Sequence, residues 1–217
     1  LITTNKVVHE SPIFITGVGR SGTHFLARLF EKINNVNAIH LDEVGNSTAD
    51  SFLIYSKWNN LNLDMAGFEY SRNFLLHDSK KKGAHYCESN PYLAFSVGDL
   101  SKIYPKSRFL ISIRNPRAVV LSHYNKGWYE KNYTPVFSKF GSVPFYHYQI
   151  EKPNHFFGRI FPNKEEEYKE WVTLSQVGKI AWMWQTINNR ILEDLKKLNL
   201  NQYKVILIDD FDYSVFQ

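Results

Sequence analysis

The chain has 217 residues, of which 43% are hydrophobic, so it is long and apolar enough for one domain with a sizeable core. This composition excludes a disordered, collagen-like or coiled-coil chain. Lys and Arg outnumber Asp and Glu by 26 to 21, a mild excess that suits an anionic partner. Apolar runs such as Phe109 to Ile113 are far shorter than the roughly 20 residues of a membrane span, so no span is expected. The single cysteine, Cys87, excludes an intrachain disulfide and favours a reducing, cytoplasmic compartment.

The apolar pattern predicts strands that alternate with helices along the chain. Strand-like runs lie at 13–16, 38–41, 84–87, 109–113 and 205–208. Helical spacing of apolar side chains lies at 25–33, at 118–126 and over a long segment, 166–197, with a break expected near Gly178. This alternation predicts an α/β fold with a central parallel sheet that is flanked by helices on both faces.

No linker, repeat or low-complexity tract divides the chain, so residues 1–217 are expected to form a single domain. The chain begins with Leu1 rather than Met and ends shortly after a strand-like run, which is compatible with a fragment truncated at its C-terminus. Residues 128–161 are rich in aromatic side chains and contain three prolines. Long loops of this kind are often lids, so this segment is expected to be a core-packed loop or a lid over a binding site.

Residues 17–23 read Gly-Val-Gly-Arg-Ser-Gly-Thr and lie between a predicted strand and a predicted helix. In that position, successive backbone N–H groups and the positive end of the helix can hold a phosphate. The pattern of nucleoside triphosphate-binding loops requires Lys after its second glycine, whereas Thr23 and His24 follow Gly22 here. This difference counts against a kinase or an ATPase, and the cation of the loop is instead Arg20.

This loop resembles the 5′-phosphosulfate loop of sulfotransferases that use 3′-phosphoadenosine 5′-phosphosulfate (PAPS), which reads K/R-S-G-T. A second motif, Arg114 followed eight residues later by Ser122, resembles the 3′-phosphate motif of the same family. The planar guanidinium and the hydroxyl suit a phosphate, and two phosphate sites suit a nucleotide that is phosphorylated at both ends. The resemblance extends more faintly over residues 12–211, where Trp182, Trp184 and the segment 209–211 match a later helix and strand of the family.

The resemblance implies a P-loop-like nucleotide-binding fold and the transfer of a sulfuryl group from PAPS to an acceptor hydroxyl, with no metal. The residues expected to bind PAPS are Gly19, Arg20, Ser21, Gly22, Thr23, His24, Arg114 and Ser122. Arg20 is also expected to be catalytic, because it can stabilise charge on the bridging oxygen of the leaving nucleotide. His24 stands where the family usually has a second Thr, and it is expected either to donate to the sulfonate or to cap the helix.

The reaction also needs a general base that accepts the proton of the acceptor hydroxyl. Glu43 is the preferred candidate because it resembles the glutamate that glycan and protein-tyrosine sulfotransferases place after the second strand. Glu88 is the second candidate, since the segment from Glu88 to Pro91 resembles the E-K-x-P segment of the family, with Ser89 in place of Lys. His40, just before the acidic pair that contains Glu43, is a further alternative.

The acceptor is expected to be a hydroxyl compound, and carbohydrate, lipid, peptide and small alcohol all remain open, with an anionic glycan among the candidates. No nucleic acid partner is expected. The histidines lack the spacing of metal ligands, so no metal site is expected. Two other functions remain as alternatives: a P-loop nucleotide kinase, and a non-catalytic module that binds a nucleotide or a polyanion.

Overall fold

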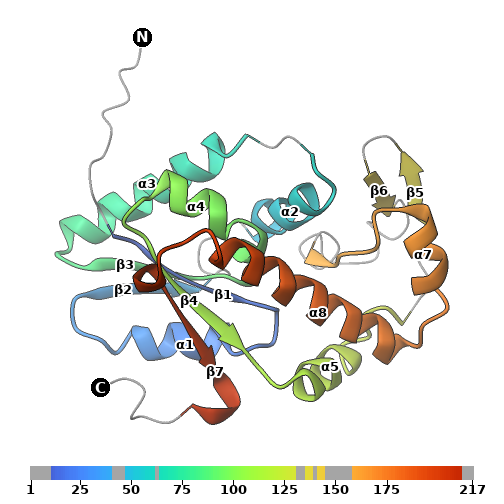
Figure 1. Cartoon of the computed structure of the whole chain (residues 1–217). Coiled ribbons are helices and arrows are strands. Elements are labelled where there is room, and N and C mark those ends of the chain that lie inside the picture. The colour runs from blue at the N-terminus through green and yellow to red at the C-terminus, as the bar shows by residue number, and fades with distance from the viewer. Residues whose placement is uncertain are drawn as a thin grey trace.

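The computed structural model describes residues 11–40, 47–61, 64–130, 135–138, 141–144 and 158–211. Within these ranges the main feature is a five-stranded sheet with the order β2-β3-β1-β4-β7, and every neighbouring pair in it is parallel (Figure 1). Its strands are β1 (Ile13–Gly17), β2 (Val36–His40), β3 (His85–Ser89), β4 (Arg108–Ile113) and β7 (Tyr203–Leu207). The sequence predicted all five strands, and the α/β fold is confirmed.

Helices connect the strands and cover the sheet. They are α1 (Thr23–Phe30), α2 (Ser47–Trp58), α3 (Ala66–Lys81), α4 (Val97–Ile103), α5 (Pro116–Tyr124), α7 (Glu165–Trp171) and α8 (Gln176–Leu195), with short 3-10 turns η2 (Pro91–Phe95), η3 (Leu200–Gln202) and η4 (Ile208–Asp210). The long helix expected over 166–197 is divided into α7 and α8. The division falls before Ser175, whose hydroxyl accepts a hydrogen bond from the Gly178 amide at 3.1 Å and so begins α8.

The sheet separates two hydrophobic cores, because successive side chains of a strand point to opposite faces. Phe14 of β1 belongs to the larger core, which lies under α3, α4 and α8, whereas the neighbouring Ile15 packs with Leu26 of α1 in the smaller core. Figure 1 shows α1 on one side of the sheet and the other three helices on the opposite side. Burial on both faces explains why the strands read as nearly continuous apolar runs.

Only part of the aromatic segment 128–161 lies within the described residues. Tyr129 and Phe161 are buried in the larger core, and their rings make an edge contact at 5.5 Å. Between them, β5 (Pro135–Ser138) and β6 (Gly141–Pro144) form a short antiparallel pair. The rest of this predicted loop or lid, residues 131–134, 139–140 and 145–157, lies outside the described part of the chain.

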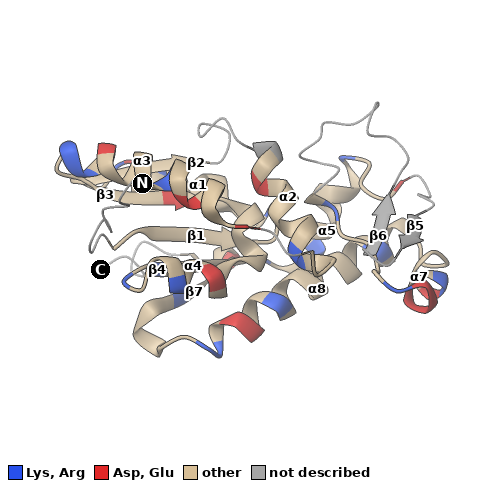
Figure 2. Cartoon of the chain, turned by 90° about the horizontal axis from the view of Figure 1, so that it is seen from above, with Lys and Arg blue, Asp and Glu red and all other residues tan. Residues whose placement is uncertain are grey.

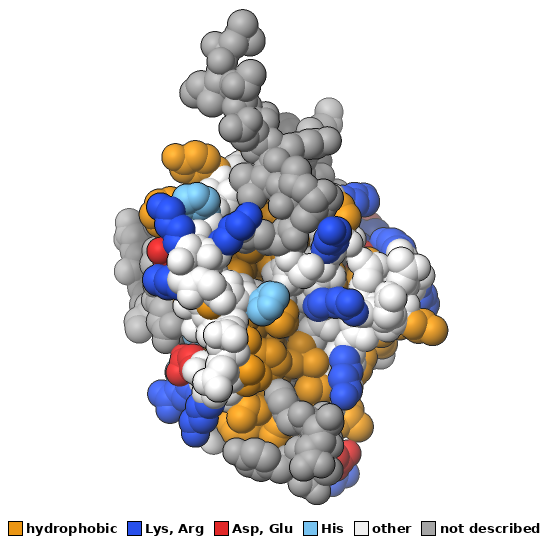
Figure 3. Space-filling view, turned by 90° about the vertical axis from the view of Figure 1, so that its left-hand side faces the viewer, with side chains coloured by type: hydrophobic (Ala, Val, Ile, Leu, Met, Phe, Trp, Pro, Cys, Tyr) orange, Lys and Arg blue, Asp and Glu red, His pale blue; other side chains and the backbone are white. Residues whose placement is uncertain are grey.

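Charges of both signs are interspersed along the elements, and the most acidic turn is the start of α7, with Glu165, Glu166 and Glu167 (Figure 2). On the face in Figure 3, hydrophobic side chains gather in the middle and Lys and Arg side chains spread around them, in keeping with the mild positive net charge of +5. No helix within the described ranges combines the length and the apolar character needed to cross a bilayer.

Candidate functional site

A cavity of about 450 Å³ lies at the carboxyl edge of the sheet. Its wall includes Gly19, Arg20, Gly22, Thr23, His24 and Arg114, so six of the eight residues predicted to bind the nucleotide meet at one cavity. The other two do not line it: Ser21 is buried in the loop between Arg20 and Gly22, and Ser122 lies on α5 in contact with Arg20. Strand β1 has β3 on one side and β4 on the other, and ligands of open α/β sheets bind at such a point, where the strand order reverses.

The loop between β1 and α1 is held in its conformation by two glycines. A Cβ atom on Gly17 would lie 2.2 Å from the Ser112 carbonyl oxygen of the paired strand β4, and Gly22 has a positive φ of 95°. Arg20 also has a positive φ, 72°, which is unusual for a residue with a side chain. Helix α1 starts with no side-chain cap and no acidic residue in its first turn, so its first amides are open to an anion.

The two predicted phosphate motifs contact each other. Arg20 Nε donates a hydrogen bond to Ser122 Oγ at 2.8 Å, although the two residues are 102 positions apart in the sequence. Arg114 Nη1 donates to the backbone oxygen of Arg20 at 3.3 Å. The register of β1 and β4, which pairs Gly17 with Ser112, brings both motifs to the same edge of the sheet.

Arg114 is held at the end of β4 by an acidic residue from the end of β7. Its Nε lies 3.5 Å from Asp209 Oδ1, and the other oxygen of Asp209 accepts a hydrogen bond from the Asn115 amide at 2.5 Å. The side chains of Arg114 and Asp209 are 37% and 41% exposed. An ion pair with this exposure contributes little stability, so an anionic ligand can replace the carboxylate at low cost.

His123, next to Ser122 on α5, was not predicted from the sequence. Its Nε2 lies 3.0 Å from the Gly19 carbonyl oxygen, which only accepts, so Nε2 carries the proton. Burial is the main cause that lowers the pKa of His123 to about 4; the hydrogen bond to Gly19 opposes this shift and the nearby charge of Arg20 adds to it, so the imidazole is neutral. The ring of Trp128 packs on it at 4.1 Å between centroids. His123 therefore holds the backbone of the loop between β1 and α1, and its role was missed because Gly19 is 104 residues away in the sequence.

His24 and His40 are brought together at the wall of the same cavity. Their rings are 4.5 Å apart between centroids and nearly parallel, with an angle of 19° between the planes. His24 comes from the first turn of α1 and is exposed, whereas His40 ends β2 and is 9% exposed. The structure thus places the alternative base His40 beside a predicted ligand of the sulfonate.

The two predicted carboxylate bases have different positions. Glu43 lies outside the described residues. Glu88 is fully buried and is not among the residues that line the cavity. Its two oxygens accept hydrogen bonds from Arg72 at 2.6 and 3.0 Å, and Tyr86 and Asn90 donate to them at 2.8 and 2.9 Å. In this conformation Glu88 has no contact with the cavity through which it could reach an acceptor.

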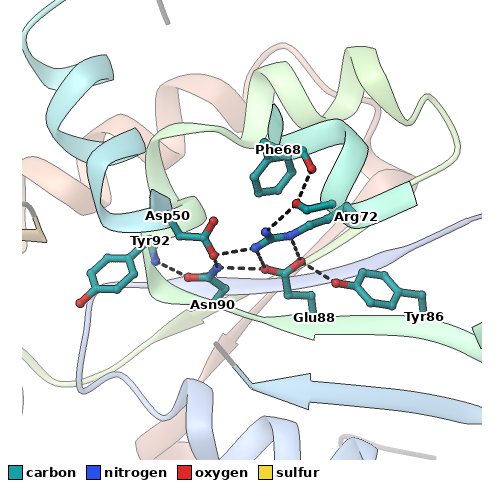
Figure 4. A network of polar contacts seen from close by, with 8 residues as sticks. Asp50, Phe68, Arg72, Tyr86, Glu88, Asn90 and Tyr92 are labelled. Atoms are coloured by element: carbon teal, nitrogen blue, oxygen red, sulfur yellow. Dashed lines mark hydrogen bonds and ion pairs between the residues drawn. The ribbon is translucent and has the colours of Figure 1, made fainter. Parts of the chain in front are cut away.

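Arg72 joins Glu88 and a second buried carboxylate, Asp50, into one network that the sequence did not suggest. Its Nη2 lies 2.6 Å from Asp50 Oδ2, and Asn90 donates to the same oxygen at 2.9 Å (Figure 4). Burial raises the pKa of Asp50, although Arg72 opposes this shift. Burial alone lowers the pKa of Arg72, but the charges of Glu88 and Asp50 outweigh it and raise this pKa, so the guanidinium is charged.

The same network links the elements around the cavity. Asp50 lies on α2, Arg72 on α3, Glu88 on β3, and Asn90 caps η2 by accepting a hydrogen bond from the Tyr92 amide at 2.9 Å. We interpret it as the internal support for α2 and η2. In the described part of the chain, no group of three His, Cys, Asp or Glu side chains is placed to hold a metal ion.

The chain has the fold of sulfotransferases of known structure. The sulfotransferase domain of the curacin biosynthetic pathway matches with a TM-score of 0.51 and 13% identity over 93% of this chain and 68% of that one. A sulfotransferase from Alicyclobacillus acidocaldarius matches with a TM-score of 0.51 and 16% identity over 94% and 75%. A sulfotransferase from Mycobacterium avium matches with a TM-score of 0.51 and 14% identity over 91% of this chain and 59% of that one. No family model and no curated protein matches the sequence.

Proposed function

We propose that this chain is a PAPS-dependent sulfotransferase that transfers a sulfuryl group to an acceptor hydroxyl. The observation that carries this proposal is the contact of Arg20 with Ser122, because it joins two anion-binding motifs at one cavity. A donor with a 5′-phosphosulfate and a 3′-phosphate needs both motifs. A nucleoside triphosphate would leave Arg114 and Ser122 without a ligand, so this contact does not favour a kinase.

In the proposed reaction, the acceptor oxygen attacks sulfur in line with the bond that breaks. The new bond joins acceptor oxygen and sulfur, and the bond between sulfur and the bridging oxygen breaks, which releases adenosine 3′,5′-bisphosphate. Arg20 and the first amides of α1 stabilise the negative charge that develops on the leaving oxygen. Arg114 and Ser122 hold the 3′-phosphate, and positioning supplies much of the rate, as in phosphoryl transfer.

The proton of the acceptor hydroxyl passes to a base of the chain. Glu43 remains our first candidate and Glu88 the second, although Glu88 would have to leave Arg72 to act. His40, stacked on His24, is the alternative within the described residues. Loss of the base typically lowers kcat by about 10²–10⁴-fold and leaves nucleotide affinity nearly unchanged. Measurements of kcat and of nucleotide affinity in the variants Glu43→Gln, Glu88→Gln and His40→Asn therefore identify the base.

Ligand binding tests the function directly. Adenosine 3′,5′-bisphosphate is expected to raise the melting temperature much more than ATP with magnesium does. The variant Arg114→Ala is expected to weaken the binding of this nucleotide by about 1.5–3 kcal/mol, the range for a hydrogen bond to a charged group. Arg117→Ala is the matched control, because Arg117 is exposed in the first turn of α5, three residues after Arg114, and does not line the cavity.

Turnover provides the second test. We expect transfer from PAPS to continue in EDTA. Equal stabilisation by ATP with magnesium, or a need for magnesium in turnover, would contradict the proposal and support a nucleotide kinase. A cytoplasmic location and a hydroxyl-bearing acceptor stay predictions.

A further inference from the structure

We propose that the acceptor is an uncharged alcohol or phenol with an apolar body, bound against a wall formed by Ile54, Tyr92, Met183 and Ile187. This inference rests on the proposed function, because the wall belongs to the same cavity as the anion-binding loop. It distinguishes among the acceptor classes that the sequence left open, and it disfavours an anionic glycan.

The acceptor wall comes from three elements: Ile54 from α2, Tyr92 from η2, and Met183 and Ile187 from α8. These side chains are between 1% and 9% exposed, so the wall is closely packed. In Figure 1, α2 and α8 lie on the side of the sheet away from α1, whose first turn carries the anion-binding amides. The cavity therefore has a polar part for the donor and an apolar part next to it.

The charges around the cavity follow the same division. Among the described residues that line the cavity, the cations are Arg20 and Arg114 in the two phosphate motifs and Lys126 just after α5, and none of these belongs to the acceptor wall. The network behind the wall contains two carboxylates and only one guanidinium, so it supplies no excess positive charge. A charged acceptor against this wall would lose its hydration without gaining a partner, whereas an apolar body would replace water there favourably.

The wall is also held in place before any acceptor binds. The side chain of Asn90 accepts from the Tyr92 amide at 2.9 Å and donates to Asp50 at 2.9 Å, which couples η2 to α2. Asp50 lies one helical turn before Ile54 on α2. A preformed wall lowers the entropic cost of binding and favours a rigid apolar acceptor.

The first test compares two acceptors that differ by one charge, 2-naphthol and 6-hydroxy-2-naphthoic acid, with PAPS as donor. We expect kcat/KM for 2-naphthol to be higher by roughly tenfold or more, since the carboxylate meets no cation in the wall. Methyl β-glucoside, a neutral but polar alcohol, is expected to be a poor acceptor. Equal or faster transfer to the naphthoate or the glucoside would overturn the inference.

The second test uses a matched pair of variants on α8. Ile187→Thr changes the acceptor wall, whereas Ile191→Thr, one turn later, makes the same exchange of an ethyl group for a hydroxyl at a buried residue that does not line the cavity. Both variants are expected to lower the melting temperature. Only Ile187→Thr is expected to raise KM for 2-naphthol, by roughly three- to tenfold, with the affinity for adenosine 3′,5′-bisphosphate unchanged. An equal KM effect of both variants would contradict a direct contact.

Failure of the inference and failure of the proposed function give different results. If adenosine 3′,5′-bisphosphate binds and only charged acceptors are used, the function stands and the inference is wrong. If neither nucleotide binding nor transfer is observed, binding of 2-naphthol is measured directly by saturation-transfer NMR. Binding that is lost in Ile187→Thr and kept in Ile191→Thr would support the wall as an apolar ligand site, and the absence of binding would overturn it.

Discussion

His123 holds the carbonyl of Gly19 through a neutral imidazole, and this gives the fold a specific dependence on pH. The pKa of His123 falls from 6.5 to about 4 on folding, because burial disfavours the charged ring. The unfolded chain therefore binds the proton more tightly. Neutral His123 therefore contributes fully to the free energy of unfolding above about pH 6.5, which is the pKa of the imidazole in the unfolded chain. This contribution is lost as the pH falls toward 4, the pKa in the folded chain.

This pKa difference corresponds to about 3 kcal/mol between neutral and acid pH. We expect His123→Gln, whose amide can still donate to Gly19, to lose much less of its free energy of unfolding as the pH falls over this range. Urea unfolding at a series of pH values measures the effect, with His77→Gln on the exposed side of α3 as the control. Parallel pH curves for the wild type and His123→Gln would contradict the prediction.

Arg20 combines a guanidinium that we propose binds the donor with a backbone conformation that costs stability. A residue with a Cβ atom pays a steric cost at its φ of 72°, whereas glycine does not. We expect Arg20→Ala and Arg20→Gly to weaken the binding of adenosine 3′,5′-bisphosphate equally, because both variants lose the guanidinium. The glycine variant is expected to be more stable than the alanine variant by about 1 kcal/mol. Thermal unfolding and nucleotide titration of the pair check this, and equal stabilities would show that the loop relaxes.

Predictability from the sequence differs among the residues of the site. Arg20, Arg114 and Ser122 lie in short motifs at strand ends, where spacing alone indicates their chemistry, and the structure brings them together. The partners of His123 and Glu88 could not be predicted, since Gly19 and Arg72 reach them only through tertiary packing. A strand-end glutamate reads the same in sequence whether it faces a ligand or a buried arginine.

At the scale of elements, the buried network makes α2, α3 and β3 depend on one another. Arg72→Met would leave Asp50 and Glu88 as two buried carboxylates without a cation. We expect this variant to lose about 3–5 kcal/mol in the free energy of unfolding, the usual cost of removing one partner of a buried ion pair. Denaturant unfolding measures it, and Arg28→Met on the exposed face of α1 is the control.

A further double variant separates the loss of charge balance from the loss of packing. The double variant carries Arg72→Met together with Glu88→Gln, and its free energy of unfolding is compared with that of each single variant. It is expected to recover part of the stability lost in Arg72→Met, because one uncompensated charge is gone. A double variant that is as unstable as the sum of the single variants would show that the ion pair itself contributes nothing.

Helices were predicted less completely than strands. The starts of two helices were marked in the sequence. Helix α1 follows the Gly-rich loop after β1, and α5, after β4, begins at Pro116. The sequence did not reveal α2 and α3, since α2 contains a run of adjacent apolar residues and α3 has many charged and polar ones, so neither shows a clear helical period. The break that the sequence placed near Gly178 lies a few residues earlier, between Trp171 and the Ser175 cap of α8.

At the scale of the whole molecule, the parallel sheet was predictable but its strand order was not. Strand β1 pairs with β3 and β4, with Ile13 opposite both Cys87 and Arg108. Such pairings depend on contacts between segments far apart in the chain, for which the alternation of strands and helices contains no signal. The chain has to close long loops before its central strand is complete, and folds of this kind form slowly.

The register of β1 and β4 also makes the binding site a property of the nearly complete fold. One phosphate motif follows β1 and the other follows β4, so an intermediate without this pairing has only half of the site. We expect adenosine 3′,5′-bisphosphate to slow unfolding in denaturant and to protect the chain from proteolysis, because it binds the native state alone. Unfolding rates that do not change with the nucleotide would contradict this. If they do change, the supply of ligand governs how long each folded molecule survives.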